Sequence, residues 1–375
     1  MAEPKCKYFG KCGGCTAQHI DYNLQLENKK HVLGHALRNS SFEGEIKVFS
    51  GDSYSYRNRM DFIFTPTGLG FRKKGEWRNT VDIEFCKISN NELNKLLGEV
   101  RSFFVKENYD YFDLIKQKGT FRYAVIRTPS NNSSISFVLN KDSTKLEEAT
   151  ILIKKFSEIT SARNIVITYV PKTTDMSISE DFYVIKGDGH LTTQLEDKTL
   201  EFSIQGFFQN NTSMGEKLVL YVKELLSKYN TNGAYLLDLY GGVGSFGIIC
   251  SDLFRGITIV ENFKGSIDSA KRNIELNKLR NAEAFVKDSK SINNIDLPKP
   301  LFVITDPPRS GMVPRAIERL LAKEPEVMIY VSCNLKQLGK ELPKFKGYVI
   351  KSAAIFDLFP QTIHCEGVIE LVKVK

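Results

Sequence analysis

A cysteine directly after an apolar strand is the first candidate for chemistry in this chain. The run 327–331 is rich in β-branched residues, and Ser332 and Cys333 follow it. Asn334 reads as the N-cap of a short helix, with Gln337 at the position of a capping box. Because a helix N-terminus carries partial positive charge, we expect it to lower the pKa of the Cys333 thiol and favour the nucleophilic thiolate. The alternative is a buried, inert thiol.

Four further cysteines have a pattern typical of metal ligands. Cys6, Cys12 and Cys15 lie in one glycine-containing loop, and Cys86 is the best candidate for a fourth ligand. Four thiolates suit either Zn²⁺ or an iron–sulfur cluster. Structural zinc sites usually combine two C-x2-C pairs, so three clustered cysteines with one distant cysteine favour an iron–sulfur cluster over zinc or free thiols.

Length and composition indicate a folded, two-domain protein whose positive charge suits a polyanionic partner without proving one. The chain has 375 residues, a formal net charge of +8 and a pI near 8.9. No apolar run reaches the roughly 18 residues that a membrane span requires, and residues 1–6 lack the apolar core of a signal peptide. We therefore expect a soluble cytoplasmic protein without a membrane partner and without an obligate protein partner.

The first half of the chain combines basic and aromatic residues on predicted strands. Arg57 and Arg59 precede a turn, and Arg72, Lys73 and Trp77 follow it. Basic side chains bind phosphates and aromatic faces stack on unpaired bases, so this pattern favours binding of single-stranded or looped RNA. A solvated sheet face with ordinary surface charges is the alternative. Further strands at 121–127, 134–139 and 164–169, with a helix before the last of them, predict an α+β module.

In the second half, strands and helices alternate, which predicts a doubly wound parallel sheet. A strand at 234–240 runs into a glycine-rich loop that contains Gly242 and Gly244, and the next strand ends at Glu261. Such a loop lets the backbone approach a nucleotide, while the acid accepts hydrogen bonds from ribose hydroxyls. The pattern fits NAD enzymes and S-adenosylmethionine enzymes alike.

Polar residues follow several of these strands. Because ligands bind outside the carboxyl ends of the strands in open α/β sheets, we expect these residues to meet in one crevice. They are Asp238, Glu261, Asp288, Asp306 and Cys333.

The chain resembles the RNA uracil-5-methyltransferases, most closely their archaeal tRNA branch. The motifs that carry the resemblance occur in order over nearly the whole chain. They are Cys6 with Cys12-Gly13-Gly14-Cys15, Arg57-Asn58-Arg59, Cys86, Phe207-Phe208-Gln209-Asn210, Asp238-Leu239-Tyr240-Gly241-Gly242-Val243-Gly244, Asp306-Pro307-Pro308-Arg309, Ser332-Cys333-Asn334 and His364-Cys365-Glu366.

This resemblance implies an α/β fold with two domains. Residues 201–375 would form a Rossmann-like class I methyltransferase domain, and residues 1–200 an α+β domain for an iron–sulfur cluster and RNA. It also implies residue roles. Cys333 would be the nucleophile and Glu366 the general base, the four cysteines would hold a [4Fe-4S] cluster, and the S-adenosylmethionine site would include Gln209, Tyr240, Glu261 and Asp306.

The implied reaction is methylation of C5 of a uridine in RNA through a covalent bond between Cys333 and C6. The T-loop uridine of tRNA is the expected target, because the likeness is to archaeal tRNA enzymes, and 23S ribosomal RNA is the alternative. More distant alternatives are an RNA cytosine-5-methyltransferase, an NAD-dependent oxidoreductase and a non-catalytic RNA-binding protein. The chain departs from the family in three respects. It starts directly at the cysteines, without the β-barrel that many relatives have, and it carries Gln361 where the family often has His. Its glycine loop opens with Tyr240-Gly241-Gly242, where the family commonly has Phe-Cys-Gly or Phe-Ser-Gly.

Overall fold

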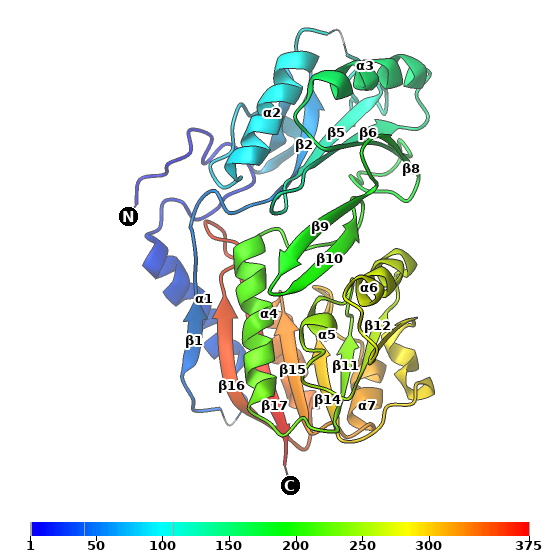
Figure 1. The fold of residues 1–375 in the computed structure, drawn as a ribbon. Coiled ribbons are helices and arrows are strands. Elements are labelled where there is room, and N and C mark those ends of the chain that lie inside the picture. Colours follow the sequence, from blue (N-terminus) through cyan, green and yellow to red (C-terminus); the bar gives the residue numbers. More distant parts are fainter. Residues whose placement is uncertain (1, 41, 108, 375) are drawn as a thin grey trace.

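A computed structural model describes residues 2–40, 42–107 and 109–374 of the chain. Its strands form two large sheets, one above the other in Figure 1, and a two-stranded ribbon lies between them. The lower sheet is built mainly from the second half of the chain, and the upper sheet from the first half.

The lower sheet has eight strands in the order β1-β16-β17-β15-β14-β11-β12-β13. Five neighbouring strands, β15 to β13 in that order, run parallel, and β17 runs antiparallel to both of its neighbours. From β11 the chain adds strands in one direction across the sheet (β12, β13) and from β14 in the other (β15), so the strand order reverses between β11 and β14. Open α/β sheets bind their ligands at such a point. The strands are β1 (Ile46–Phe49), β11 (Tyr235–Leu239), β12 (Gly256–Glu261), β13 (Ala282–Val286), β14 (Leu301–Thr305), β15 (Val327–Ser332), β16 (Tyr348–Phe356) and β17 (Glu366–Lys373).

Helices cover both faces of this sheet, so its strands are apolar on both sides. Helices α4, α5 and α6 belong to the apolar core on one face, and α1, α7 and α8 to the core on the other. The helices are α1 (Tyr22–Ala36), α4 (Thr212–Ser227), α5 (Ser245–Ile249), α6 (Lys264–Leu276), α7 (Pro314–Leu321) and α8 (Leu335–Glu341), with short 3₁₀ turns η1 (Ser289–Asn294) and η2 (Leu342–Lys344).

The upper sheet has seven strands in the order β4-β3-β2-β5-β6-β7-β8, of which only β6 and β7 pair in parallel. Phenylalanines such as Phe64, Phe104 and Phe137 fill its core beneath α2 and α3. The elements are α2 (Asn91–Phe104), α3 (Leu146–Ile159), β2 (Arg59–Thr65), β3 (Gly68–Lys73), β4 (Glu76–Asp82), β5 (Phe121–Arg127), β6 (Ser134–Asn140), β7 (Asn164–Val170) and β8 (Phe182–Lys186), and the ribbon is β9 (His190–Leu195) with β10 (Lys198–Ser203).

The fold confirms the predicted α/β sheet and the predicted α+β module, with three differences. The pattern of residues 17–39 predicts a polar helix, and that of residues 54–64 a strand; the observed helix α1 is shorter and β2 begins at Arg59. Several elements were not predicted, namely β1, α2, α7 and the strands β8 to β10. Strand β1 pairs with β16, so the sheet of the second half takes its edge strand from the first half. The domain division at residue 200 stays a prediction. Among the described helices, none combines the length and apolarity needed to cross a bilayer.

Candidate active site

Cys333 lies beside Glu366 because of the register between two strands. Strands β15 and β17 pair antiparallel with Ser332 opposite Gly367. One step further along that register brings Cys333, which directly follows β15, next to Glu366, the first residue of β17. The thiol is half-buried, and the sheet therefore holds it and a carboxyl group together at the edge where ligands bind.

Asn334 caps α8 as predicted. Its Oδ1 accepts a hydrogen bond from the backbone N–H of Gln337 at 3.3 Å. The capping box is not completed, because the Gln337 side chain donates to Glu341 at 2.7 Å instead. The Asn334 side chain also donates through Nδ2 to the carbonyl of Arg309 at 2.9 Å, which ties the loop after β14 to the loop after β15.

The predicted lowering of the Cys333 pKa by the helix N-terminus is wrong. Burial, followed by the negative charges of Glu366 and Asp306, raises the pKa of this thiol to about 11. The positive charge of Arg309 acts in the opposite direction but is the smaller effect. A thiol next to two carboxyl groups keeps its proton unless something removes it or brings positive charge nearby.

Glu366 is a buried carboxyl group with unused hydrogen-bonding capacity. Only 6% of the residue is exposed, and its Oε2 has no hydrogen-bond partner within the described residues. Burial, followed by the negative charge of Asp306, raises the pKa of this carboxyl group to about 8. A group that exchanges its proton near neutrality can serve as a general base or acid.

The carboxyl groups of Asp238 and Asp306 lie on β11 and directly after β14, the two strands between which the strand order reverses. Burial raises the pKa of Asp238 to about 7, and burial with the charge of Asp238 raises that of Asp306 to about 7. Asp238 Oδ2 accepts from the backbone N–H of Gly247 at 2.8 Å, whereas no described residue bonds its Oδ1. A ligand with a positive charge would be stabilised beside these groups.

Arg309 and His364 link the loops around Cys333, and both are exposed. Arg309 Nη2 lies 3.4 Å from Nδ1 of His364, which is two residues before Glu366. Both residues belong to the motifs that carry the family resemblance, but no role was predicted for either. A cation placed directly after two prolines at a strand end was the signal that could have indicated one.

The glycine-rich loop after β11 bends through three residues in the left-handed region. Tyr240 has φ +62°, Gly242 φ +54° and Gly244 φ +87°. A Cβ on Gly241 would lie 2.7 Å from Cγ2 of Ile259, whereas one on Gly242 would meet nothing within 4 Å. The loop therefore packs tightly on β12 at one glycine and presents bare backbone to open space at the next, as a nucleotide-binding loop requires.

The remaining predicted cofactor residues surround this loop. Tyr240 donates its hydroxyl to Ser289 at 2.8 Å, which places it beside the segment that begins with Asp288. Glu261 Oε1 accepts from the backbone N–H groups of Asn262 and Phe263 at 2.7 and 2.9 Å. Phe263 is 46% exposed and offers an aromatic face beside the loop that was not predicted.

Two further predicted cofactor residues are held in place by hydrogen bonds, Gln209 at its backbone carbonyl and Asp288 at its side chain. Gln209 accepts at its carbonyl from the side chain of Asn58 at 3.1 Å, which joins the upper sheet to the segment before α4. Asp288 caps η1 by accepting from the backbone N–H of Lys290 at 2.8 Å. The roles of both residues toward a ligand stay predictions.

The four N-terminal cysteines line one cavity of about 540 Å³, together with Arg57 and Arg59. Burial and the charges of Cys86 and Cys6 raise the pKa of Cys12 to about 11, although a backbone hydrogen bond from Gly14 opposes them. The thiols therefore lie close enough to affect one another. In the described residues no three Cys, His, Asp or Glu side chains are close enough to hold a single metal ion.

Most of the predicted RNA-binding cations are paired with acids. Arg59 binds Asp61 at 3.0 Å, Arg72 binds Asp175 at 3.3 Å and Lys73 binds Glu76 at 2.6 Å. Arg57 donates through Nε to the carbonyl of Arg59 at 2.9 Å.

Trp77 differs from these cations, because it is 59% exposed on β4 with the Arg78 guanidinium 5.2 Å from its ring centroid. It is therefore the most accessible of the predicted RNA contacts.

Comparisons with known proteins show the family to which the chain belongs. The model of the tRNA (Uracil-5-)-methyltransferase family matches residues 21–374. The tRNA (uracil(54)-C(5))-methyltransferase of Pyrococcus abyssi is 32% identical over 98% of this chain and 86% of its own length. An uncharacterized RNA methyltransferase of Caldanaerobacter subterraneus is also 32% identical, over 97% of this chain and 83% of its own.

A solved structure gives the same result for the fold. The crystal structure of the Pyrococcus abyssi tRNA (uracil-54, C5)-methyltransferase with S-adenosyl-L-homocysteine superposes with a TM-score of 0.80 at 28% identity. The match covers 96% of this chain and 86% of that one. It confirms the predicted Rossmann-like methyltransferase fold. The chain belongs to the tRNA (uracil-5-)-methyltransferase family.

Proposed function

We propose that this protein transfers a methyl group from S-adenosylmethionine to C5 of the T-loop uridine of tRNA. The observation that carries the proposal is the pairing of Cys333 with Glu366 across β15 and β17, at the carboxyl end of a methyltransferase sheet. One group can add to the pyrimidine ring and the other can remove a proton from it. The similarity to enzymes named for uracil-54 of tRNA supports the choice of target.

The chain's own residues account for the covalent chemistry. C5 of uracil is a weak nucleophile, so Cys333 first gives up its thiol proton to a base and its thiolate adds to C6, which makes the ring an enolate. C5 of the enolate then attacks the methyl group and displaces the cofactor's sulfur, which takes the electrons of the broken bond. Glu366, as the carboxylate, then takes the proton from C5. The electrons of that C–H bond re-form the C5–C6 double bond, and the Cys333 thiolate leaves C6.

The residues around β11 and β14 fit S-adenosylmethionine. The loop at Gly242 offers open space beside bare backbone, and Asp238 has a buried oxygen without a partner among the described residues. We assign Tyr240, Glu261 and Asp306 to this site, together with Gln209, Gly244 and Asp288. Once bound, the cofactor supplies an electrophilic methyl group, and its positive sulfonium suits the nearby carboxyl groups.

The cysteine cavity fits a [4Fe-4S] cluster held by Cys6, Cys12, Cys15 and Cys86. Four thiolates in one cavity repel one another, and the pKa values of Cys12 and Cys15 are raised by burial and by the charges of the neighbouring cysteines. Bound iron would supply the positive charge that lets all four ionise. A cluster is wider than a single ion, so thiols spaced too far apart for one metal ion still suit it. We assign the cluster a structural role, because Cys12 pairs through its backbone with Lys73 of β3.

We also assign RNA binding to the upper sheet. Trp77 is the most accessible of the predicted contacts and can stack on an unpaired base. The predicted cations lie on neighbouring strands of the same sheet, with Arg57 directly before β2, Arg59 on β2, and Arg72 and Lys73 on β3. A phosphate could replace their present partners.

The test is methylation of defined RNA by the purified protein with labelled S-adenosylmethionine. A tRNA transcript is expected to accept one methyl group at the T-loop uridine, and a transcript with cytidine at that position none. A 23S rRNA fragment serves as the second substrate. Methylation of the rRNA alone would overturn the choice of tRNA, and methylation of neither RNA would overturn the proposal.

A further inference from the structure

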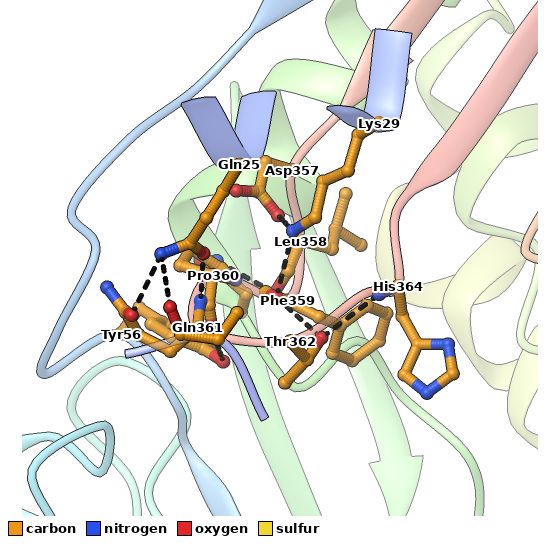
Figure 2. A network of polar contacts seen from close by, with 12 residues as sticks. Gln25, Lys29, Tyr56, Asp357, Leu358, Phe359, Pro360, Gln361, Thr362 and His364 are labelled. Atoms are coloured by element: carbon orange, nitrogen blue, oxygen red, sulfur yellow. Dashed lines mark hydrogen bonds and ion pairs between the residues drawn. The ribbon is translucent and has the colours of Figure 1, made fainter. Parts of the chain in front are cut away.

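The loop before Glu366, residues 357–365, is held by side chains that come from helix α1. Figure 2 shows Gln25 and Lys29 of α1 pointing into this loop. Lys29 of the helix and Asp357 of the loop form an ion pair although they are 328 positions apart in the sequence. The loop directly precedes Glu366, the proposed general base. Contacts that fix the conformation of the loop therefore also fix the position of Glu366.

Lys29 forms a fully buried ion pair with Asp357. Its Nζ lies 2.7 Å from Asp357 Oδ1, and the two side chains are 4% and 0% exposed. The same Nζ donates to the carbonyl of Phe359 at 3.2 Å (Figure 2). Because desolvating two charges is costly, a buried pair is weak evidence for a stabilising role, and a role in fixing one conformation must be argued from what it holds.

The Phe359 carbonyl connects Lys29 to the part of the loop nearest the active site. It also accepts a hydrogen bond from the Thr362 hydroxyl at 2.7 Å. The Thr362 oxygen in turn accepts from the backbone N–H of His364 at 3.1 Å. Three consecutive polar contacts therefore lead from Lys29 to a residue two positions before Glu366.

Gln25 holds the middle of the loop through two amide hydrogen bonds. Its Nε2 donates to Gln361 Oε1, and the backbone N–H of Gln361 donates back to Gln25 Oε1, both at 3.1 Å. Gln361 has φ +66°, a left-handed conformation that is unfavourable for a residue with a Cβ. Such a conformation persists only where the surroundings impose it, and it marks functional segments.

The cysteine-bearing segment supports the same residue. The carbonyl of Gln361 accepts from the backbone N–H groups of Thr16 and Ala17, each at 3.0 Å, directly after Cys15. Tyr56 donates its hydroxyl to the carbonyl of Pro360 at 3.0 Å. The loop is thus bonded by helix α1, by residues 16 and 17 and by Tyr56, which all lie outside the methyltransferase motifs that surround Cys333. Within those motifs, Arg309 contacts the loop at His364.

We propose that Gln25 and Lys29 are positioning residues for the general base: they hold loop 357–365 so that Glu366 can reach the C5 proton of the methylated uridine. The proposal rests on the function proposed above. It assigns no contact with substrate to either residue, and it predicts a defect in one step of the reaction.

That step is the breakdown of the covalent intermediate. After methyl transfer, the C5–H bond must break with its proton going to Glu366, the C5–C6 double bond must re-form, and the bond from Cys333 to C6 must break. Methyl transfer before it depends on Cys333 and the cofactor site. A misplaced base therefore slows release and leaves RNA bound covalently to the protein.

The experiment measures both steps in a single turnover with a tRNA transcript. Methyl transfer is followed as label incorporated into RNA, and release as the loss of RNA that co-migrates with protein under denaturing conditions. The first variant is Gln25→Leu, which removes the amide contacts to Gln361 without leaving a buried charge unpaired. The second is Lys29→Met combined with Asp357→Leu, which removes both charges so that neither is left uncompensated.

Lys30→Met is the matched control, because Lys30 is the next lysine on α1, is half-buried and has no ion pair within the described residues. The two test variants are expected to release RNA about tenfold more slowly or worse, with methyl transfer changed less than about twofold. The control is expected to match the wild-type protein in both steps.

If methyl transfer and RNA release slow equally in the test variants, or if release keeps the wild-type rate, the positioning role is overturned. A wild-type protein that methylates no RNA would instead overturn the proposed function.

Discussion

Asp306 and Glu366 enter the active site from different strands, and burial together with the negative charge of Asp306 raises the pKa of Glu366. Burial is the main reason that the pKa of Glu366 rises to about 8, and the negative charge of Asp306 adds to it. The pKa of Asp306 itself rises to about 7. The edge of the sheet therefore collects acids that stay partly protonated near neutrality. The proposed roles use this directly, since Glu366 has to gain a proton during the reaction.

Replacing Glu366 with glutamine is expected to stop turnover after methyl transfer. The amide keeps the size of the side chain but cannot accept the C5 proton, so the bond between Cys333 and C6 persists. Turnover should fall by roughly 10²–10⁴-fold, the usual contribution of a general base. Denaturing gel electrophoresis of protein incubated with tRNA and S-adenosylmethionine checks this. Normal turnover by Glu366→Gln would assign the base to another residue.

The buried acids predict that stability falls as pH rises. The pKa of Glu366 is about 8 in the folded protein against an ordinary value of 4.5. Between these values the unfolded chain releases its proton first, so the free energy of unfolding decreases as pH rises from about 4.5 to about 8. Asp238 and Asp306, whose pKa values rise from 3.8 to about 7, add to the same trend.

Thermal unfolding at about pH 5 and about pH 8 measures this trend, with a higher Tm expected at the lower pH. In Glu366→Gln the difference should shrink. The exposed Glu148→Gln serves as the control and should leave it unchanged. A Tm that rises with pH would contradict the raised pKa values.

The cysteine cavity is expected to bind iron and sulfide. Protein purified without oxygen should contain about four iron atoms and four sulfides per chain and should absorb visible light. Cys86→Ser should lose both signals, whereas Cys250→Ala, which changes a cysteine buried in the lower sheet's core, should retain them. One zinc ion per chain would favour the zinc alternative, and absence of any metal would leave the thiols without this role.

Trp77 is expected to contribute to RNA affinity. Removing one stacking side chain costs about 1–3 kcal/mol, so Trp77→Ala should raise KM for tRNA by roughly tenfold with little change in kcat. Ile159→Ala is a matched control, because Ile159 is 68% exposed at the end of α3. Steady-state kinetics over a range of tRNA concentrations separates the two constants. If Trp77→Ala leaves KM for tRNA unchanged, the RNA binds at another surface of the protein.

Much of the fold and the site could be predicted because local pattern determines it. The apolar run before Cys333, the capping residue Asn334 and the alternation of strands and helices are local features, and the structure has each of them. The grouping of four cysteines around one cavity followed from their chemistry.

Features that depend on distant contacts could not be predicted in this way. The pKa of Cys333 was expected to fall because the helix N-terminus is visible in the sequence, whereas the burial and the two carboxyl groups that raise it are not. Likewise, nothing local indicates that Lys29 pairs with Asp357 or that Arg72 pairs with Asp175. Strand β1 was missed because four residues at a sheet edge carry little periodicity.

The central claim is that the Cys333 sulfur bonds to C6 of a uridine. Transcripts made with 5-fluorouridine test it directly, because fluorine on C5 cannot be removed as a proton and the adduct therefore persists. We predict that mass spectrometry finds the methylated fluorouridine on the peptide that contains Cys333, and that Cys333→Ala forms no adduct. An adduct on another cysteine, or one that survives in Cys333→Ala, would contradict the account.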